Sequence, residues 1–385
     1  MKQPATILIL GGGVGGLVAA RTLRKALAPR HRIILVDRQR EYLFAPSLLW
    51  LMTGHRRPEQ IVRPLARLER KGIEVIEGTV RSIDPLGRRV EVDGASLAAD
   101  YLVIALGAEL APEAVPGLAE AGHSFYTLEG AQSLERALAA FRSGRLVILT
   151  AAPAYKCPAA PYEAAMLLAS ELDSRGVRDR IQIDLYAAEP GPMGVAGPEV
   201  SAAVRRMVED RGIAYHPGHQ IASVDPAARL LRFADGTQAD FDLLAYVPLH
   251  RAPHVVREAG LTDESGWIPV DRHTLETRFP SVYAVGDVTT IPLKLGKPLP
   301  KAGVFAHGEA EVVARNIARA ISGKGRPAAF QGEGACFVEI GNGRAALGTG
   351  NFYAEPTPEV RMKAPGRRWH WSKVLFEKSW LWRWI

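Results

Sequence analysis

The sequence predicts an α/β protein with two Rossmann-like dinucleotide-binding domains, followed by a C-terminal hairpin and an amphipathic tail. A strand, a GxGxxG turn, a helix and a second strand follow one another over residues 6–37. A second strand–turn–helix–strand unit covers residues 146–187. Apolar runs at 100–110 and 281–289 read as further buried strands of the first domain, so the second domain is expected to be an insertion.

The first unit carries a dinucleotide fingerprint. Its turn places Gly11, Gly13 and Gly16 in the GxGxxG pattern, and the next strand, RIILV, ends in Asp37. Glycines allow a tight turn and a close approach of the backbone to a pyrophosphate at the helix N-terminus. An acid about twenty residues farther along is placed to bind a ribose. This order predicts dinucleotide binding, and the alternative is a glycine-rich structural turn.

Two later segments indicate which dinucleotide is bound. DYLVIALGAEL, residues 100–110, contains Gly107 after its strand, and SVYAVGDVT, residues 281–289, contains Gly286 and Asp287. Together they resemble the two further signatures of two-dinucleotide-domain flavoproteins. In those proteins the first signature closes the flavin domain before an inserted domain. The second brings an aspartate to the ribityl and phosphate region, so the resemblance implies FAD.

The signatures divide the chain into four expected parts. They are 1–108, the first part of the FAD domain; 109–240, the inserted domain; 241–328, the second part of the FAD domain; and 329–385, the C-terminal region. Within these parts we expect helices from Tyr162 to about Ser174 and from about Phe305 to Ile321. Turn signals predict hairpins at Asp235–Gly236 and Asn342–Gly343.

The turn after the strand LVILT has no glycine. Residues 151–161 carry three prolines and Cys157, and a Cβ or a proline ring obstructs the approach of a pyrophosphate to backbone N–H groups. The inserted domain is therefore not expected to bind NADH, although Glu189 follows the next strand where a ribose-binding acid could lie. Because Cys157 lies just before a helix N-terminus, we expect its thiolate to be favoured.

The ordered motifs resemble sulfide:quinone oxidoreductases and the flavoprotein subunit of flavocytochrome c sulfide dehydrogenase. The resemblance covers essentially the whole chain and rests on GGGVGG, FAPS (44–47), ALGA, KCPAAPYE (156–163), VPLHRAP (247–253), AVGD, LPKAGVFAHGEAEVVARNI (299–317) and GACF (334–337). It implies that Cys157 and Cys336 form a redox disulfide beside the flavin, that sulfide as HS⁻ attacks it, and that two electrons pass through FAD to a quinone. It also implies a proton-shuttle role for Glu163, with a structural helix acid as the alternative, and a place for Lys301 near the flavin or the quinone, with a surface lysine as the alternative.

The chain departs from this family pattern at two points. Some quinone-linked members carry a third cysteine, whereas this chain has two. Haem-linked members bind flavin covalently through a cysteine near the FAPS position and carry export signals, and neither is found here, so non-covalent FAD and a quinone acceptor are expected. The alternatives are a single-subunit NADH:quinone oxidoreductase, a sulfide dehydrogenase with a cytochrome acceptor, and a flavin-containing binding protein without catalysis.

The C-terminal tail holds most of the excess positive charge. The 385-residue chain has a net charge of +7, and residues 361–385 supply +6 of it together with five of the seven tryptophans. As a helix from about Trp371, the tail would place Trp371, Val374, Leu375, Leu381, Trp382 and Ile385 on one side. Tryptophan and lysine favour a membrane interface. We therefore expect peripheral attachment to the cytoplasmic side of the cell membrane, with a core helix or a dimer contact as alternatives.

The expected quinone or membrane residues are Phe305, Phe337, Tyr353, Phe376, Trp380 and Trp382. No run reaches the roughly 18 apolar residues of a membrane span. Since the charge is confined to one short tail, nucleic acid is not an expected partner. The histidine pairs 216/219 and 250/254 lie beside prolines without further ligands, so no metal site is expected. The sequence leaves open whether the chain forms a homo-oligomer.

Overall fold

The computed structural model describes residues 3–385. Its first sheet is wholly parallel. Its strand order is β21-β9-β1-β2-β5. The strands are β1 Thr6–Leu10, β2 Arg32–Asp37, β5 Glu74–Glu77, β9 Tyr101–Ile104 and β21 Val282–Ala284. Both segments that were expected to be further strands of the first domain therefore pair there, on the side of β1 opposite β2.

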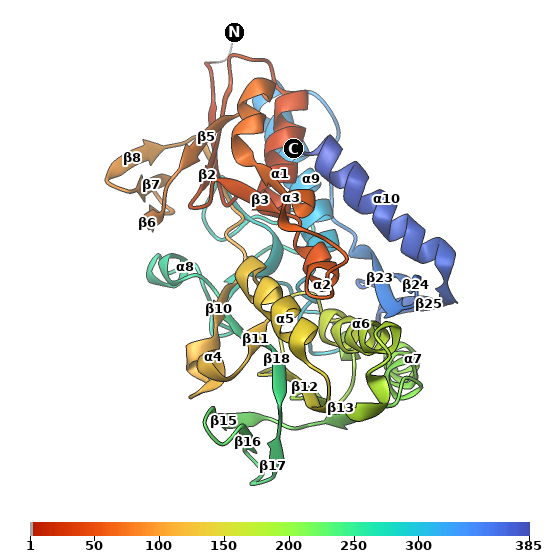
Figure 1. Ribbon diagram of the computed structural model, residues 1–385. Coiled ribbons are helices and arrows are strands. Elements are labelled where there is room, and N and C mark those ends of the chain that lie inside the picture. The colour runs from red at the N-terminus through yellow and green to blue at the C-terminus, as the bar shows by residue number, and fades with distance from the viewer. Residues whose placement is uncertain (1–2) are drawn as a thin grey trace.

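Each face of this sheet is covered, as its short uninterrupted apolar strands require. Ile7 and Ile9 face the helices α1 (Val14–Ala26) and α9 (Gly303–Ser322), which lie side by side (Figure 1). Leu8 and Leu10 face an antiparallel sheet and the helix α8. The elements on this second face are β6 Val80–Asp84, β7 Arg89–Val92, β8 Ala95–Ala98 and α8 His254–Glu258.

The second sheet is also parallel and has the order β11-β18-β12-β13-β14. Its strands are β11 His123–Ser124, β12 Gly144–Thr150, β13 Ile181–Ala187, β14 Ile213–Pro217 and β18 Leu243–Val247. Since β18 lies beyond residue 240, the expected end of the insertion, we place that end after Val247. The chain thus folds as two Rossmann-like domains, as the sequence predicted.

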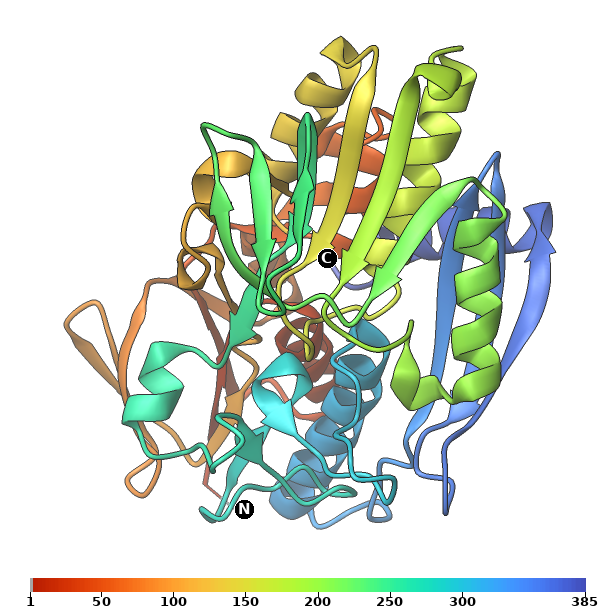
Figure 2. The same cartoon turned by 90° about the horizontal axis from the view of Figure 1, so that it is seen from below.

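Helices cover one face of the second sheet, and a small antiparallel sheet covers the other (Figure 2). The helices are α5 Leu128–Ala140, α6 Ala160–Ser174 and α7 Pro198–Glu209, and the small sheet consists of β15 Ile221–Asp225, β16 Leu230–Phe233 and β17 Gln238–Asp240. The helix α6 begins two residues before the expected Tyr162. The chain turns at Asp235–Gly236 as predicted, since Gly236 adopts a φ of +86°.

The C-terminal region forms a three-stranded sheet and a helix. The expected hairpin consists of β23 Glu333–Gly341 and β24 Arg344–Asn351, and it turns through Asn342 and Gly343, which both have positive φ. A third strand, β25 Glu359–Gly366, was not predicted and pairs with β24. The helix α10, Arg367–Arg383, runs from this sheet towards α1 along the outside of the molecule (Figure 1).

Shorter elements connect these parts. Residues 109–111 and 249–251 pair where the chain enters and leaves the inserted domain, and residues 41–43 pair with 62–64. The remaining elements are β3 Glu41–Leu43, β4 Val62–Pro64, β10 Glu109–Ala111, β19 Leu249–Arg251, β20 Ile268–Pro269, β22 Thr289–Thr290, α2 Leu48–Leu51, α3 Pro58–Ile61 and α4 Leu118–Ala121. Among the helices of residues 3–385, none combines the length and the apolar character that a membrane crossing needs.

The tail helix α10 does not hold the six apolar residues on one side, as was expected. Val374, Leu381 and Ile385 are buried, but Trp371, Leu375 and Trp382 are exposed at 62, 66 and 84%. The buried stripe instead includes two charged side chains, Lys373 and Glu377, and two tryptophans, Trp380 and Trp384. The expectation was wrong because it sorted residues by polarity, whereas the buried charges find partners in other parts of the fold.

Candidate active site

The glycine turn between β1 and α1 has the geometry of a phosphate cradle. Gly11 has a φ of +99°, and a Cβ on Gly16 would lie 1.8 Å from the Gly11 carbonyl oxygen. Gly13 is the N-cap of α1; its side is open, and the first turn carries no acidic residue. The free N–H groups at this helix end therefore fit an anionic ligand.

Asp37 lies at the end of β2, beside the same turn. Its Oδ2 accepts a 2.5 Å hydrogen bond from Gly12 N, and its Oδ1 accepts one of 2.7 Å from Gln39 N. Gly107, which follows β9, has a φ of +66° and no atom within 4 Å of an added Cβ. The expected glycines and Asp37 thus meet at the carboxyl edge of the first sheet, where parallel α/β sheets bind their ligands.

The Gly286–Asp287 turn lies beside the start of α9, where the oppositely charged side chains of Glu309 and Lys301 contact its backbone. Gly286 N donates a 2.6 Å hydrogen bond to Glu309 Oε2. Lys301 Nζ donates to the carbonyl oxygens of Asp287, at 2.7 Å, and Thr289, at 3.0 Å. The ammonium also lies 3.4 Å from the centre of the Trp267 ring. Lys301 is therefore part of a built site and not a free surface lysine.

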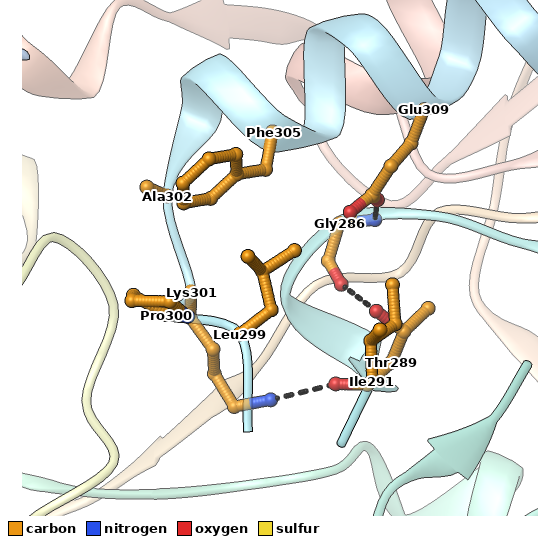
Figure 3. Close-up of a pocket in the computed structure, with 9 residues that line it drawn as sticks. All are labelled: Gly286, Thr289, Ile291, Leu299, Pro300, Lys301, Ala302, Phe305 and Glu309. Atoms are coloured by element: carbon orange, nitrogen blue, oxygen red, sulfur yellow. Dashed lines mark hydrogen bonds between the residues drawn. The ribbon is translucent and has the colours of Figure 1, made fainter. Parts of the chain in front are cut away.

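A small cavity opens beside this turn (Figure 3). Its volume is about 10 Å³, and it is lined by Gly286, Thr289, Ile291, Leu299, Pro300, Lys301, Ala302, Phe305 and Glu309. Burial raises the pKa of Glu309 to about 7 and lowers that of Lys301 to about 8. Burial likewise raises the pKa of Asp287, against the attraction of Lys156 and Lys301. The sequence reading missed Glu309, although an acid two turns into an apolar helix is an unusual core residue.

Cys157 connects the two domains. It has a φ of +54°, a left-handed conformation that non-glycine residues rarely adopt. Its N–H donates a 2.7 Å hydrogen bond to the carbonyl of Lys301, and its own carbonyl accepts from Ala160 N at 2.9 Å. The glycine-free turn thus holds its cysteine against the Gly286–Asp287 region of the first domain.

Cys336 and Glu163 lie in the same site as Cys157. Cys336 is in β23, opposite Gly348, and α6 packs against this strand. The buried Glu163 carboxylate accepts 2.8 Å hydrogen bonds from Glu339 N and from Lys373 Nζ. Both cysteines are free thiols here. The structure therefore brings the three expected catalytic residues together and adds Lys373.

The electrostatics of the thiols differ from the expectation. Burial first, then the charges of Cys336 and Glu163, raises the pKa of Cys157 well above its ordinary value. Burial and Glu163 raise the pKa of Cys336 to about 11, and Lys373 opposes the shift at both thiols. The N–H of Ala160 at the start of α6 favours a Cys157 thiolate, as expected, but burial penalises the charged form by more, so the net shift of the pKa is upward.

Glu189, which could have bound a ribose, is already saturated. Its Oε1 accepts hydrogen bonds from the hydroxyl groups of Tyr155 and, at 2.7 Å, Tyr162. Its Oε2 accepts from Thr150 Oγ1 at 2.9 Å. The side chains of the glycine-free turn and of α6 therefore occupy the acceptor that a nucleotide hydroxyl would use.

The expected quinone or membrane residues fall into separate groups. Phe305 and Tyr353 belong to an aromatic cluster with Phe330, and Phe305 also meets Phe352 with ring centres 4.9 Å apart. Phe376 and Trp380 pack on Phe44, at 5.9 and 6.2 Å. Phe337 is half-buried in β23, and Trp382 is exposed on α10. Trp380, at 5% exposure, packs in the core and does not lie on the outer surface of the tail.

Within residues 3–385, no three or more histidine, cysteine, aspartate or glutamate side chains are grouped so that they could hold a metal ion. His216 instead pairs with Asp184 at 2.8 Å and stacks on Tyr186, 4.3 Å between ring centres. His250 donates from Nδ1 to Pro248 O at 2.9 Å, and His254 pairs with Glu258 at 3.2 Å. These histidines have ordinary polar and aromatic partners.

The chain is similar to known proteins along most of its length. The family model of the pyridine nucleotide-disulphide oxidoreductases matches residues 5–310. The sulfide-quinone reductase of Aquifex aeolicus is 30% identical, over 98% of this chain and 90% of that protein. The mitochondrial sulfide:quinone oxidoreductase of Mus musculus is 22% identical, over 92% of this chain and 80% of that protein. The X-ray structure of the Aquifex aeolicus sulfide:quinone oxidoreductase superimposes with a TM-score of 0.89 at 28% identity, covering 99% of this chain and 91% of that one.

Proposed function

From the premise that the chain belongs to the pyridine nucleotide-disulphide oxidoreductase family, and within it to the sulfide:quinone oxidoreductases, we propose that Cys157 and Cys336 oxidise sulfide. The enzyme binds FAD and delivers the electrons to a quinone. The observation that carries the proposed site is the meeting of both cysteines with Glu163 beside the Lys301 segment of the first domain.

The proposed reaction begins with thiol–disulfide exchange. HS⁻ attacks one sulfur of a Cys157–Cys336 disulfide, the S–S bond breaks, and the other cysteine leaves as a thiolate while a persulfide remains. When the disulfide re-forms, zero-valent sulfur leaves, so that HS⁻ has lost two electrons and one proton. The quinone takes up these two electrons with two protons. FAD, when bound, supplies the two-electron link between the thiols and the quinone.

The proposed FAD site uses the glycines and acids described above. Gly11 and Gly16 permit the tight turn, Gly13 leaves room for the pyrophosphate, and Asp37 would hold a ribose. Gly107, Gly286, Asp287 and Lys301 would surround the flavin end. We expect non-covalent binding, because the sequence offers no cysteine near residues 44–47.

NADH is a poor candidate for the electron donor. The turn at residues 151–161 lacks the glycines that a second pyrophosphate needs, and Glu189 is occupied by two tyrosines and a threonine. A donor that attacks sulfur needs neither feature. Sulfide therefore fits the inserted domain better than a nicotinamide nucleotide does.

We also propose that α10 attaches the enzyme to the cytoplasmic face of the membrane. Trp371, Leu375 and Trp382 are exposed on its outer side, and Lys378 lies exposed between them. Aromatic side chains favour the interfacial region, and each cation near an anionic surface adds about 1 kcal/mol. A quinone dissolved in the bilayer would then be reached from the same side.

The test is quinone reduction by the purified holoenzyme. With sulfide as donor, a short-chain ubiquinone should be reduced, with one quinol formed for each sulfide consumed. With NADH at the same concentration, the rate should be at least about 100-fold lower, since the site lacks both nucleotide-binding features. Equal rates with the two donors would contradict the proposed function.

A further inference from the structure

The helix α10 presents two functional faces. Its outer face carries the exposed Trp371, Leu375 and Trp382. Its inner face carries Lys373, which is buried and only 9% exposed in its side chain. Both faces belong to one helix, so a surface that binds the outer face is linked through α10 to the partners of Lys373.

The ammonium group of Lys373 lies in the thiol site, the site formed by Cys157, Cys336 and Glu163. Its Nζ lies 2.8 Å from Glu163 Oε1, and the Glu163 side chain is only 3% exposed. Glu163 is held a second time by Glu339 N at 2.8 Å. The ammonium also lies 5.1 Å from the centre of the Trp50 ring, whose face attracts a cation. This ion pair joins residues 210 positions apart in the chain.

The other charges around this pair are few. From β23 come Cys336 and Glu339, and from the turn before α6 comes Cys157. From α10 itself comes His370, whose Nδ1 lies 3.0 Å from Glu339 Oε2. One turn farther along α10, Glu377 has its own partners, Arg56 Nη2 at 2.8 Å and Ser47 Oγ at 2.5 Å. Lys373 interacts with both thiols, and Lys156, the residue before Cys157, is a further cation near the Cys157 thiol.

The charge on Lys373 is stable in this setting. Burial opposes it, but Glu163 and Glu339 outweigh burial and raise its pKa. At both thiols the Glu163 carboxylate disfavours the thiolate and the Lys373 ammonium favours it. A buried thiolate next to a carboxylate needs such a counter-charge.

We propose that Lys373 is a positioning residue for the sulfur chemistry, holding Glu163 in place and supplying the positive charge beside which the leaving cysteine becomes a thiolate. This rests on the proposed function. When HS⁻ opens the disulfide, one S–S bond breaks, one S–S bond forms to the incoming sulfur, and the negative charge of HS⁻ passes to the leaving cysteine. That charge appears in the site that Lys373 faces.

The tail has a second role in this proposal. The helix that we place on the membrane also completes the thiol site, so residues 367–385 are more than an anchor. Removing the tail would remove Lys373 and leave Glu163 as a buried carboxylate without its lysine.

The experiment measures the ionisation of both thiols without turnover. The reduced holoenzyme is alkylated with iodoacetamide over a range of pH, and the peptides with Cys157 and Cys336 are quantified by mass spectrometry. With only two cysteines, each rate belongs to one residue. The variants are Lys373→Met, Lys373→Arg and Glu163→Gln, and Lys378→Met is the matched control on the exposed face of the same helix.

Lys373→Met should move the alkylation midpoint of the thiols upward, slowing alkylation below the midpoint at least about tenfold, which is one pKa unit. Lys373→Arg should restore most of the rate, and Lys378→Met should equal the wild type. Glu163→Gln should move the midpoint downward, because the carboxylate is removed while Lys373 keeps Glu339 as counter-ion.

Unchanged midpoints in folded Lys373→Met would overturn the proposal. If Lys373→Met does not fold, the Glu163→Gln arm decides, and an unchanged midpoint there overturns it equally. Folding is checked by near-ultraviolet circular dichroism and flavin content. Failure of the wild type to oxidise sulfide would contradict the proposed function and would leave the alkylation result unaffected, so the two failures are distinguishable.

Discussion

The amide of Cys157 donates a 2.7 Å hydrogen bond to the carbonyl of Lys301, and this contact ties the inserted domain to the Gly286–Asp287 region. A cysteine at the same position on a flexible loop would have no fixed relation to that region. The bond and the left-handed φ of Cys157 hold the thiol at the domain boundary.

Cys157→Ser and Cys336→Ser should each slow sulfide-dependent flavin reduction by at least about 100-fold, because exchange needs an attacked sulfur and a leaving thiolate. Both variants should keep their FAD, since neither residue is in the glycine turn. Stopped-flow absorbance under nitrogen gives the rate, and the visible flavin spectrum gives the cofactor content. Wild-type rates in either variant would show that the pair is not the sulfide acceptor.

Two glycines of the first turn should behave differently. An added Cβ on Gly16 would lie 1.8 Å from Gly11 O, whereas one on Gly13 meets no atom within 4 Å. Gly16→Ala should therefore destabilise the fold itself. Gly13→Ala should change the stability of FAD-free protein by less than about 1 kcal/mol, as an N-cap glycine allows, yet weaken FAD binding.

The measurements are thermal unfolding of the FAD-free protein and a fluorescence titration with FAD. Gly13→Ala with wild-type FAD affinity would mean that the pyrophosphate does not lie against this helix end. The matched positions matter because both substitutions are chemically identical and differ only in what surrounds the new methyl group.

The local parts of this structure were predictable from the sequence. The GxGxxG turn, the Gly286–Asp287 turn and the Asn342–Gly343 hairpin were found because glycine and asparagine mark particular backbone conformations. The Lys373–Glu163 pair was missed, since 210 residues separate the partners and no local pattern joins them. The tyrosine partners of Glu189 were missed for the same reason, because no local sequence pattern joins them to this carboxylate.

The tail shows where polarity alone misleads. Its sequence was expected to place six apolar residues on one side, but the structure buries Val374, Leu381 and Ile385 together with Lys373 and Glu377 and leaves Trp371 and Trp382 exposed. Lys373 and Glu377 can be buried because Glu163 and Arg56, on neighbouring elements, form ion pairs with them. Only the fold supplies that information.

The outer face of α10 should control membrane binding without affecting sulfur chemistry. Trp371→Gln, Leu375→Gln and Trp382→Gln combined should lower the affinity for anionic liposomes at least about tenfold, since the exposed apolar surface is removed. Sulfide-dependent flavin reduction in solution should stay near the wild-type rate. Deletion of residues 367–385 should instead abolish both, because it also removes Lys373.

Liposome flotation at two salt concentrations measures the binding. Full retention of the triple variant on liposomes would place the membrane contact elsewhere. Loss of flavin reduction in the triple variant would show that these side chains also support the fold.

Glu309 should make stability depend on pH. Burial raises its pKa from 4.5 to about 7, so the folded state favours the protonated acid. The stability it contributes is fully present below pH 4.5 and is lost as pH rises through 7, amounting to about 3 kcal/mol. Glu309→Gln keeps an acceptor for Gly286 N and removes this titration.

Unfolding of the FAD-free protein in urea between pH 5 and 8.5 checks this. The wild type should lose more stability over that range than Glu309→Gln does. Parallel pH curves for the two proteins would mean that Glu309 does not change its protonation within the range.

The most direct test of sulfide oxidation through the thiol pair is anaerobic mixing of the oxidised holoenzyme with sulfide or with NADH, followed by a quinone. The account predicts that sulfide bleaches the visible flavin absorbance within the turnover time, that NADH leaves it unchanged, and that quinone restores it. Bleaching by NADH at a rate comparable to that with sulfide, or a flavin that sulfide does not reduce, would contradict the account.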